Sequence, residues 1–442
     1  MRILLLTQII PYPPDAGPRV KTWHVLRYLR ERGHEVILAS FVRPEEEEYI
    51  PTVQAQCEAV FTVPIYRSKM GNVFYLFKSY ITGRPYLIER EDLRDMRLLI
   101  QRILATEQID VIHADQLTMA QFAFSSSILI DKTFPPRNTR SQTPEYTSNI
   151  QRAGQNKPIC VFDAHNAVWS IVERMGQNAS KFMQPVVTVE AKRIKRYEGK
   201  VVANYDYTLA VTEVDRLALL QAVDVYRKSE NQPNKSLTGN RSDNGMITVF
   251  PIAVDTIQLQ PIDRLAGSKN IVTMGTLHYP PNADGIRWFV REVFPLVLQQ
   301  APEATLTIIG KNPPEDLLEL SSKDPQKVIV TGFVPELKPY FEKSALMVVP
   351  VRAGSGMRVR ILEAFSQAIP VITTTVGLEG IDAKPGVDVL VADTPQEFSS
   401  AVINLMMDET LQRRLAENGR ALAASRYDWR TALTKLDEIY SG

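Results

Sequence analysis

The chain has 442 residues, of which 44% are hydrophobic and 23% are charged, and its formal net charge is +1. This length suits two domains better than one, and the composition is ordinary for a globular protein. The balanced charge provides no strong field for nucleic acid, and Cys57 and Cys160 stand in no metal-ligand spacing.

The first residues, MRILLLTQIIPYPP, resemble a signal peptide only superficially. Gln8 interrupts a short apolar core, and no small-residue cleavage site follows. We therefore interpret residues 3–7 as a buried strand. No run reaches the roughly 18 apolar residues that a membrane span needs. Two separated cysteines fit free thiols in a reducing compartment, so we predict a cytoplasmic protein.

Short apolar segments then alternate with helix-periodic segments along most of the chain. Most of these segments are continuously apolar, which is typical of parallel strands buried on both faces. The pattern predicts an α/β fold with doubly wound parallel sheets. The expected strands are 3–7, 35–41, 110–114, 159–164, 207–212, 247–252, 270–275, 304–310, 328–333, 346–351, 370–375 and 389–392.

About twelve strands suggest two sheets, and the break between them is expected in residues 250–268, where prolines and polar residues gather. The polar segments 131–157 and 227–245 are interpreted as mobile insertions. An apolar stripe predicts a helix over 284–299. Thr394 to Glu397 forms a capping box with proline at the first helical position.

Residues 72–88 mix aromatic side chains with Lys78 and Arg84. A helix of this kind can lie on a membrane surface or contact a lipid-linked acceptor. The other interpretation, a helix packed on the first sheet, is preferred.

The most informative segment is 346–374, where an apolar run ends in Gly354-Ser355-Gly356. Arg358 and Arg360 follow, then Glu363 in a helical pattern, then a second apolar run. A strand, a glycine turn and a helix N-terminus with cations provide a seat for a phosphate group, since backbone N–H groups and the helix dipole favour an anion there. A plain strand-to-helix turn is the alternative.

The spacing of Arg358 and Glu363 extends this interpretation. Helical residues rise about 1.5 Å each, so Glu363 is expected roughly 7 Å along the helix axis from Arg358. That is about the distance from a diphosphate to its ribose. A carboxylate at this position can accept hydrogen bonds from ribose hydroxyls, while the arginines neutralise the phosphates.

Several pieces together resemble retaining nucleotide-sugar glycosyltransferases of the family-4 type, which have the GT-B fold of two facing Rossmann-like domains. The matching pieces begin with LLLTQIIPYPPDAGPRVKTWHVLRYLRERGHEV and continue with FDAHNAVW, MGTLHYPPNADGIRWF, GSGMRVRILEAFSQAIPVITTTVGLEGI and RYDW. The resemblance implies an N-terminal acceptor-side domain over 1–255 and a donor-binding domain over 256–426. It also implies a C-terminal helix over 427–442 that returns to the first domain.

In the second domain, the resemblance implies that Glu363 is the nucleotide-ribose carboxylate. Ser355 stands where the family usually has a glutamate that meets the donor sugar. The loop after strand 270–275 contains Gly275 but lacks the usual arginine and lysine, so Arg358 and Arg360 are expected to hold the diphosphate. The expected donor site is completed by Gly354, Ser355 and Gly356.

In the first domain, the resemblance implies that Gly17 approaches the donor phosphates and the acceptor, with Lys21 adding charge. His165 follows strand 159–164 and would contact the transferred sugar, whereas His113 is more plausibly structural. The expected catalytic residues are thus Arg358, Glu363 and His165.

The leading hypothesis is transfer of a sugar from a nucleotide-diphosphate sugar to an acceptor hydroxyl with retention of configuration. The acceptor would be a carbohydrate or a lipid-linked molecule, for example of a cell-envelope polysaccharide. No cofactor and no metal are expected, because no Asp-x-Asp pair is placed beside a strand end.

Three alternatives stay open. A non-catalytic sugar-nucleotide binder is suggested by Ser355, and an epimerase or phosphorylase would share the fold. A dinucleotide oxidoreductase is disfavoured because Val359 occupies the third position of the glycine fingerprint.

Overall fold

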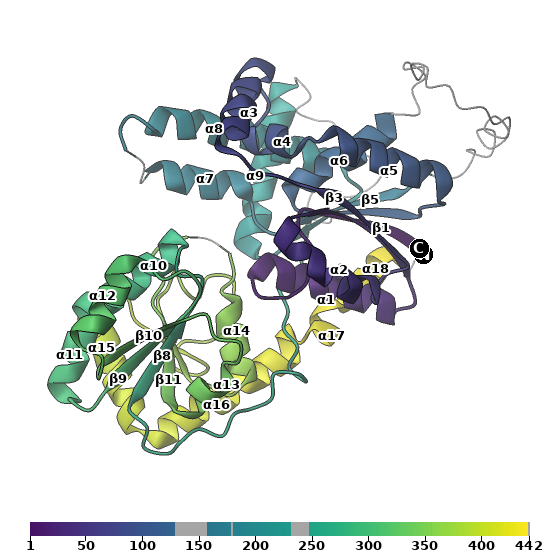
Figure 1. The fold of residues 1–442 in the computed structure, drawn as a ribbon. Helices are drawn as coiled ribbons and strands as arrows, with labels where there is room; N and C mark the ends of the chain where they lie inside the picture. Colours follow the sequence, from purple (N-terminus) through teal and green to yellow (C-terminus); the bar gives the residue numbers. More distant parts are fainter. Residues whose placement is uncertain (129–156, 178–179, 231–246, 355, 441–442) are drawn as a thin grey trace, which may run out of the picture. The chain divides into compact units, whose positions relative to one another are not determined.

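A computed structural model gives the structure of the chain and describes residues 1–128, 157–177, 180–230, 247–354 and 356–440 (Figure 1). The chain divides into two compact units, unit 1 with Met1–Val249 and Ile439–Gly442, and unit 2 with Phe250–Glu438. Each unit contains one parallel β-sheet with helices around it, as the continuously apolar strands predict. The predicted α/β class with two parallel sheets is confirmed.

The sheet of unit 1 has seven strands in the order β3-β2-β1-β4-β5-β6-β7. Their bounds are β1 Arg2–Thr7, β2 Glu35–Val42, β3 Ala59–Pro64, β4 Val111–Asp115, β5 Ile159–Ala164, β6 Tyr207–Ala210 and β7 Ile247–Val249. Strand β3 is missing from the predicted set. It lies at the sheet edge and is only partly buried, and Thr62 and Pro64 interrupt its apolar residues.

The helices of unit 1 connect these strands. They are α1 Gly17–Glu31, α2 Ile50–Gln54, α3 Lys69–Thr82, α4 Tyr86–Glu91, α5 Arg94–Thr106, α6 Leu117–Ile128, α7 Val168–Gln177, α8 Gln184–Asn204 and α9 Glu213–Ser229, with a 3₁₀ turn at Pro44–Tyr49. The expected insertion 131–157 lies almost wholly outside the described residues. The expected insertion 227–245 begins inside α9, and the rest lies outside the described residues apart from residue 230.

The segment 72–88 is two helices and not one. Gly83 ends α3 with a φ of +71°, in the left-handed region that glycine favours, and α4 starts at Tyr86. The preferred interpretation, a helix packed on the first sheet, is wrong for α3, whereas Leu87 and Ile88 of α4 do join the core of unit 1. Ser79 is the one buried residue of α3, and the aromatic side chains on its other face are exposed.

The sheet of unit 2 has six strands in the order β10-β9-β8-β11-β12-β13. Their bounds are β8 Asn270–Met274, β9 Thr305–Ile309, β10 Val328–Gly332, β11 Ser344–Val349, β12 Val371–Thr373 and β13 Leu390–Val391. Trp288, Phe289 and Phe398 form an edge-to-face aromatic cluster in the core beside this sheet.

The helices of unit 2 are α10 Pro280–Trp288, α11 Phe294–Gln300, α12 Glu315–Lys323, α13 Lys338–Glu342, α14 Val359–Ser366, α15 Pro395–Met407, α16 Glu409–Leu422 and α17 Trp429–Ala432. The predicted helix 284–299 is therefore α10 and α11, joined by a π-helical turn at Phe289–Val293. The predicted capping box is confirmed. Thr394 Oγ1 accepts from the Glu397 N–H at 3.2 Å, and a Glu397 carboxylate oxygen accepts from the Thr394 N–H at 3.3 Å.

The predicted C-terminal helix is divided into α17, a 3₁₀ turn at Leu433–Leu436 and α18 Asp437–Tyr440. Its last residues belong to unit 1, where Tyr440 is buried, as the predicted return of the chain requires. Among the described residues, no helix combines the length and the apolar character that crossing a bilayer demands.

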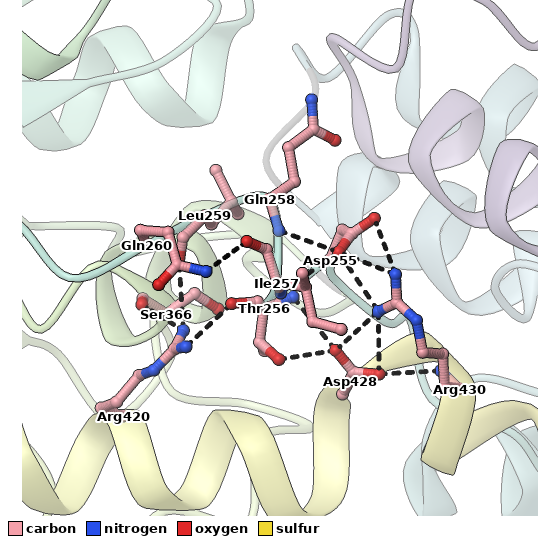
Figure 2. A network of polar contacts seen from close by, with 10 residues as sticks. All are labelled: Asp255, Thr256, Ile257, Gln258, Leu259, Gln260, Ser366, Arg420, Asp428 and Arg430. Atoms are coloured by element: carbon pink, nitrogen blue, oxygen red, sulfur yellow. Dashed lines mark hydrogen bonds and ion pairs between the residues drawn. The ribbon is translucent and has the colours of Figure 1, made fainter.

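A polar network in unit 2 fastens the segment after β7 to the segment after α16 (Figure 2). The buried Asp428 carboxylate accepts from the backbone N–H of Thr256 at 3.1 Å and from its hydroxyl at 2.6 Å. Arg420 donates to the Thr256 carbonyl at 2.8 Å and to the Leu259 carbonyl at 3.0 Å. Arg430 joins the Asp255 and Asp428 carboxylates. Side chains thus provide hydrogen-bond partners for backbone N–H and carbonyl groups in a segment that belongs to no helix or sheet.

Candidate functional site

In unit 2, the loop from β11 to α14 contains the glycine turn that the sequence predicts. Gly354 has a φ of +115° and Gly356 a φ of +81°, both in the region that only glycine adopts without strain. Ser355 lies outside the described residues. Because α14 begins at Val359, its free backbone N–H groups follow directly after this turn.

Arg358 is the N-cap residue of α14, and its side chain lies over the turn. Its Nη1 donates to the Gly356 carbonyl at 2.9 Å. A Cβ atom on Gly354 would lie 3.1 Å from Arg358 Nη2. The guanidinium therefore adds positive charge at the end of the helix where the dipole already favours an anion.

Arg360 connects three segments of unit 2. Its Nη1 donates to the Met274 carbonyl at the end of β8 at 2.8 Å, and its Nη2 donates to Asn282 Oδ1 in α10 at 2.7 Å. A Cβ atom on Gly275 would come within 2.2 Å of Nη1, so only glycine leaves room for this guanidinium. This explains the predicted site residue Gly275 through a contact with Arg360.

The charge of Arg360 is not balanced by an ion pair with any carboxylate of the described residues. Its Nε is buried and has no hydrogen-bond acceptor among them. Burial, together with the neighbouring charge of Arg358, lowers the pKa of Arg360 to about 10. The side chain is still a cation at neutral pH, which makes an anionic ligand favourable beside it.

Glu363 lies five residues after Arg358 in α14 and is half-buried. Its carboxylate accepts no hydrogen bond from the described part of the chain. Burial raises the pKa of Glu363 to about 7, and the charge of Arg360 opposes this rise only in part. A carboxylate with open acceptor positions beside the Arg360 cation suits a ligand that carries both hydroxyl and phosphate groups.

Unit 1 contains a second polar cluster at the carboxyl ends of β4 and β5. Lys21 in α1 forms an ion pair with Asp163, and both side chains are buried. Thr22 donates to Asp115 Oδ1 at 3.0 Å, and His165 Nε2 lies 2.7 Å from the same oxygen. His113 Nε2 lies 3.5 Å from Asp163 Oδ2.

The electrostatics of this cluster are dominated by Asp163. Burial alone would raise the pKa of Asp163, but the charge of Lys21 and the nearby His113 ring outweigh burial and hold it below its usual range. Lys21, expected to add charge for the donor, instead balances Asp163.

One ligand atom each from Asp115, Asp163 and His165 lies within 4.8 Å of the others, a spacing that could hold a metal ion. The Lys21 ammonium already supplies a cation to this group through its ion pair with Asp163.

The three residues that the sequence analysis considered in unit 1, Gly17, His165 and His113, have different surroundings in the structure. Gly17 is the first residue of α1, whose N-cap residue Ala16 provides no side-chain cap. His165 is buried and held by Asp115, while its Nδ1 has no hydrogen-bond partner among the described residues. His113 hydrogen-bonds through Nδ1 to the Tyr440 hydroxyl, which agrees with a structural role.

The sequence prediction does not include Asp115, Asp163 or Tyr440. A signal for the two aspartates was present, because DVIHAD and ICVFDAH end adjacent parallel strands with acidic and histidine residues.

Comparisons with known proteins agree with this geometry. Residues 268–408, all in unit 2, match the family model described as Glycosyl transferases group 1. A Klebsiella pneumoniae protein named "Uncharacterized 44.6 kDa protein in cps region" is 19% identical, with 98% of each chain covered.

Two solved structures are similar over the full length of the chain. HepE from Anabaena, in complex with UDP and glucose, has a TM-score of 0.64 at 14% identity and covers 100% of this chain and 99% of its own. Sucrose-phosphate synthase from Thermosynechococcus elongatus has a TM-score of 0.64 at 15% identity and covers 100% of this chain and 98% of its own. These similarities confirm the GT-B architecture of two parallel-sheet units.

Proposed function

We propose that this protein is a glycosyltransferase that binds a nucleotide-diphosphate sugar in unit 2 and transfers the sugar to an acceptor hydroxyl. One observation carries the proposal. Arg360 is a half-buried cation without an ion-pair partner, and it lies beside Glu363, a carboxylate that accepts no hydrogen bond; both statements concern the described residues. Both follow a glycine turn at a helix N-terminus.

The comparisons support this proposal. The family match covers the part of unit 2 that contains Gly275, Arg358, Arg360 and Glu363. The solved HepE structures hold UDP, UDP with glucose, or UDP-glucose. A donor of the same chemical class carries phosphates that suit the Arg358 and Arg360 cations and ribose hydroxyls that suit the Glu363 carboxylate.

In this proposal the protein's main task is electrostatic. Arg358, Arg360 and the α14 N-terminus stabilise the charge that develops on the leaving diphosphate. Glu363 accepts hydrogen bonds from the ribose hydroxyls and so positions the nucleotide. No cofactor enters the proposal. Retention of configuration rests on the family resemblance, and no nucleophile is assigned.

The role of unit 1 in this proposal is to bind the acceptor. His165, whose buried Nδ1 has no hydrogen-bond partner in the described part of the chain, is the proposed contact to the transferred sugar. The acceptor is proposed to be a carbohydrate or a lipid-linked molecule, such as a precursor of a cell-envelope polysaccharide. Cys57 and Cys160 are free thiols, which supports the cytoplasmic location that we propose.

A thermal-shift panel of UDP-, GDP-, ADP- and TDP-sugars tests the proposed donor. At about 100 times its Kd, a ligand that binds only the folded protein should stabilise it by about 2.7 kcal/mol. We expect one of the four to do so, and we expect Glu363→Ala to weaken its affinity roughly tenfold or more, because charged hydrogen bonds to ribose are lost. No stabilisation by any of them would contradict the proposal.

The arginines allow a matched control. Arg358→Ala should weaken binding of the nucleoside diphosphate itself. Arg352→Ala removes an exposed arginine of the same loop that is already ion-paired with Asp284 at 3.1 Å, and it should change affinity little. Equal effects of the two substitutions would refute the specific role of Arg358.

A further inference from the structure

Helix α3 of unit 1 presents an apolar face to solvent. Six of its side chains recur at helical spacing and are 62–86% exposed; they are Met70, Val73, Phe74, Phe77, Tyr80 and Ile81, here named the α3 face. A stripe of this kind normally points toward a core. In α3 the opposite side, around Ser79, contacts the rest of the unit instead.

The start of α8 continues this surface. Phe182 is 93% exposed, and Met183, Val186 and Val189 are each half exposed or more. The Arg193 guanidinium lies 6.0 Å from the ring centroid of Tyr80, which joins α8 to the α3 face. Glu190 also accepts a hydrogen bond from the Tyr86 N–H at 2.6 Å, so the two helices are held together through the start of α4.

The charges around this surface are mainly positive. Helix α3 contains Lys69 and Lys78 and no acidic residue, and Lys78 forms an ion pair with Glu89 of α4 at 2.7 Å, which leaves Lys69 as the cation of α3 available to a ligand. Helix α8 contains five cations against Glu190 and Glu198, and Glu198 is fully buried. Exposed Lys69, Lys181 and Lys192 form no ion pair among the described residues.

We propose that the α3 face and the start of α8 bind the surface of a bilayer that contains anionic lipids. Exposed aromatic and aliphatic side chains can enter the headgroup boundary, while surrounding lysines and arginines attract anionic lipids. Charge complementarity selects this occupant over a second copy of the chain, since self-pairing would bring like charges together.

This inference does not depend on the proposed transferase activity, because bilayer binding needs no sugar donor. If both hold, unit 1 works at a membrane, and the acceptor belongs to the lipid-linked class of the proposed function.

Vesicle co-sedimentation of the full chain tests the inference. We expect binding to vesicles of phosphatidylcholine with phosphatidylglycerol, and weaker binding to phosphatidylcholine alone or at high salt. The double substitution Phe74→Asp with Phe77→Asp should abolish binding. Lys69→Glu should weaken it by about fivefold or more for the cation lost. These side chains are exposed, so the thermal unfolding temperature should hardly change.

Two substitutions in unit 2 serve as controls. Leu265→Asp places a charge at a position that is 66% exposed, and Lys323→Glu reverses an exposed cation. Neither should alter vesicle binding. The inference is overturned if the natural chain binds neither vesicle, if the controls and the α3 variants behave alike, or if the α3 variants instead abolish a concentration-dependent dimer.

Discussion

The ionised carboxylate of Glu363 lowers the folding stability of the free protein. Burial raises its pKa to about 7 from an ordinary value of 4.5. Between these values the folded protein holds a proton that the unfolded chain has released, so stability falls as pH rises through this window. A pKa shift of this size corresponds to a loss of at most about 3 kcal/mol in the free energy of unfolding, and this loss is complete by pH 8. Glu363 thus lowers stability at the pH where its charge suits a ligand, as functional sites commonly do.

The substitution Glu363→Gln tests this cost. The neutral amide resembles the protonated acid, and at pH 5 the fall in stability has only begun, so we expect the unfolding free energies of the two proteins to differ by less than about 1 kcal/mol there. At pH 8 the variant should be more stable by up to about 3 kcal/mol. Urea denaturation at both pH values measures the difference.

Glu417→Gln, which changes an exposed glutamate of the same unit, is the control and should show no such pH dependence. A Glu363→Gln difference that is the same at pH 5 and pH 8 would mean that burial of the carboxylate carries no cost.

At the scale of elements, the network of Asp428 holds two irregular segments of unit 2 together (Figure 2). Removing this carboxylate by Asp428→Ala would leave the Thr256 N–H and hydroxyl buried without an acceptor. Each such group costs about 1–3 kcal/mol, so we expect a loss of roughly 2–5 kcal/mol of unfolding free energy. Denaturant unfolding provides the measurement.

Asp408→Ala is the matched control for this prediction. Asp408 caps α16 by accepting from the Leu411 N–H at 2.9 Å, but that contact is exposed. Losing a surface cap should cost only about 1 kcal/mol. If both substitutions destabilise equally, the buried network contributes no more than an ordinary helix cap.

The elements that could be predicted from the sequence are those whose signal is local. Central strands such as β1 and β11 are continuously apolar, and the Thr394 capping box needs only four residues. The amphipathic pattern of α3 is also local, but periodicity does not say which face the fold covers. The packed-helix interpretation failed for that reason.

The residues of the candidate site also divide into those with a local sequence signal and those that only the fold brings together. Arg358 is the N-cap residue of α14 and Glu363 lies inside that helix, so their spacing is local and can be expected from the sequence. The contact of His113 with Tyr440 joins residues 327 positions apart, and that of Thr22 with Asp115 joins residues 93 apart. Spacing along the chain contains no information about such pairs. They arise only when parallel strands bring their carboxyl ends to one edge.

At the scale of the whole molecule, the two units differ in continuity. Unit 2 is one uninterrupted stretch, whereas unit 1 requires the last residues of the chain. Tyr440 is buried there, stacks on the His113 ring at 6.3 Å between centroids, and hydrogen-bonds to its Nδ1. The C-terminus therefore completes the core beside the polar cluster of unit 1.

Tyr440→Ala should consequently destabilise unit 1 alone, by about 3–5 kcal/mol as for other buried aromatic residues. Hydrogen exchange read by mass spectrometry can localise the effect, since amides of β1, β4 and β5 should exchange faster while those of β8, β11 and β12 keep their protection. Tyr440→Phe retains the stacked ring and loses only the hydroxyl, so its effect should be about 1 kcal/mol. Equal loss of protection in both sheets would show instead that the two units unfold as one cooperative body, despite each having its own core.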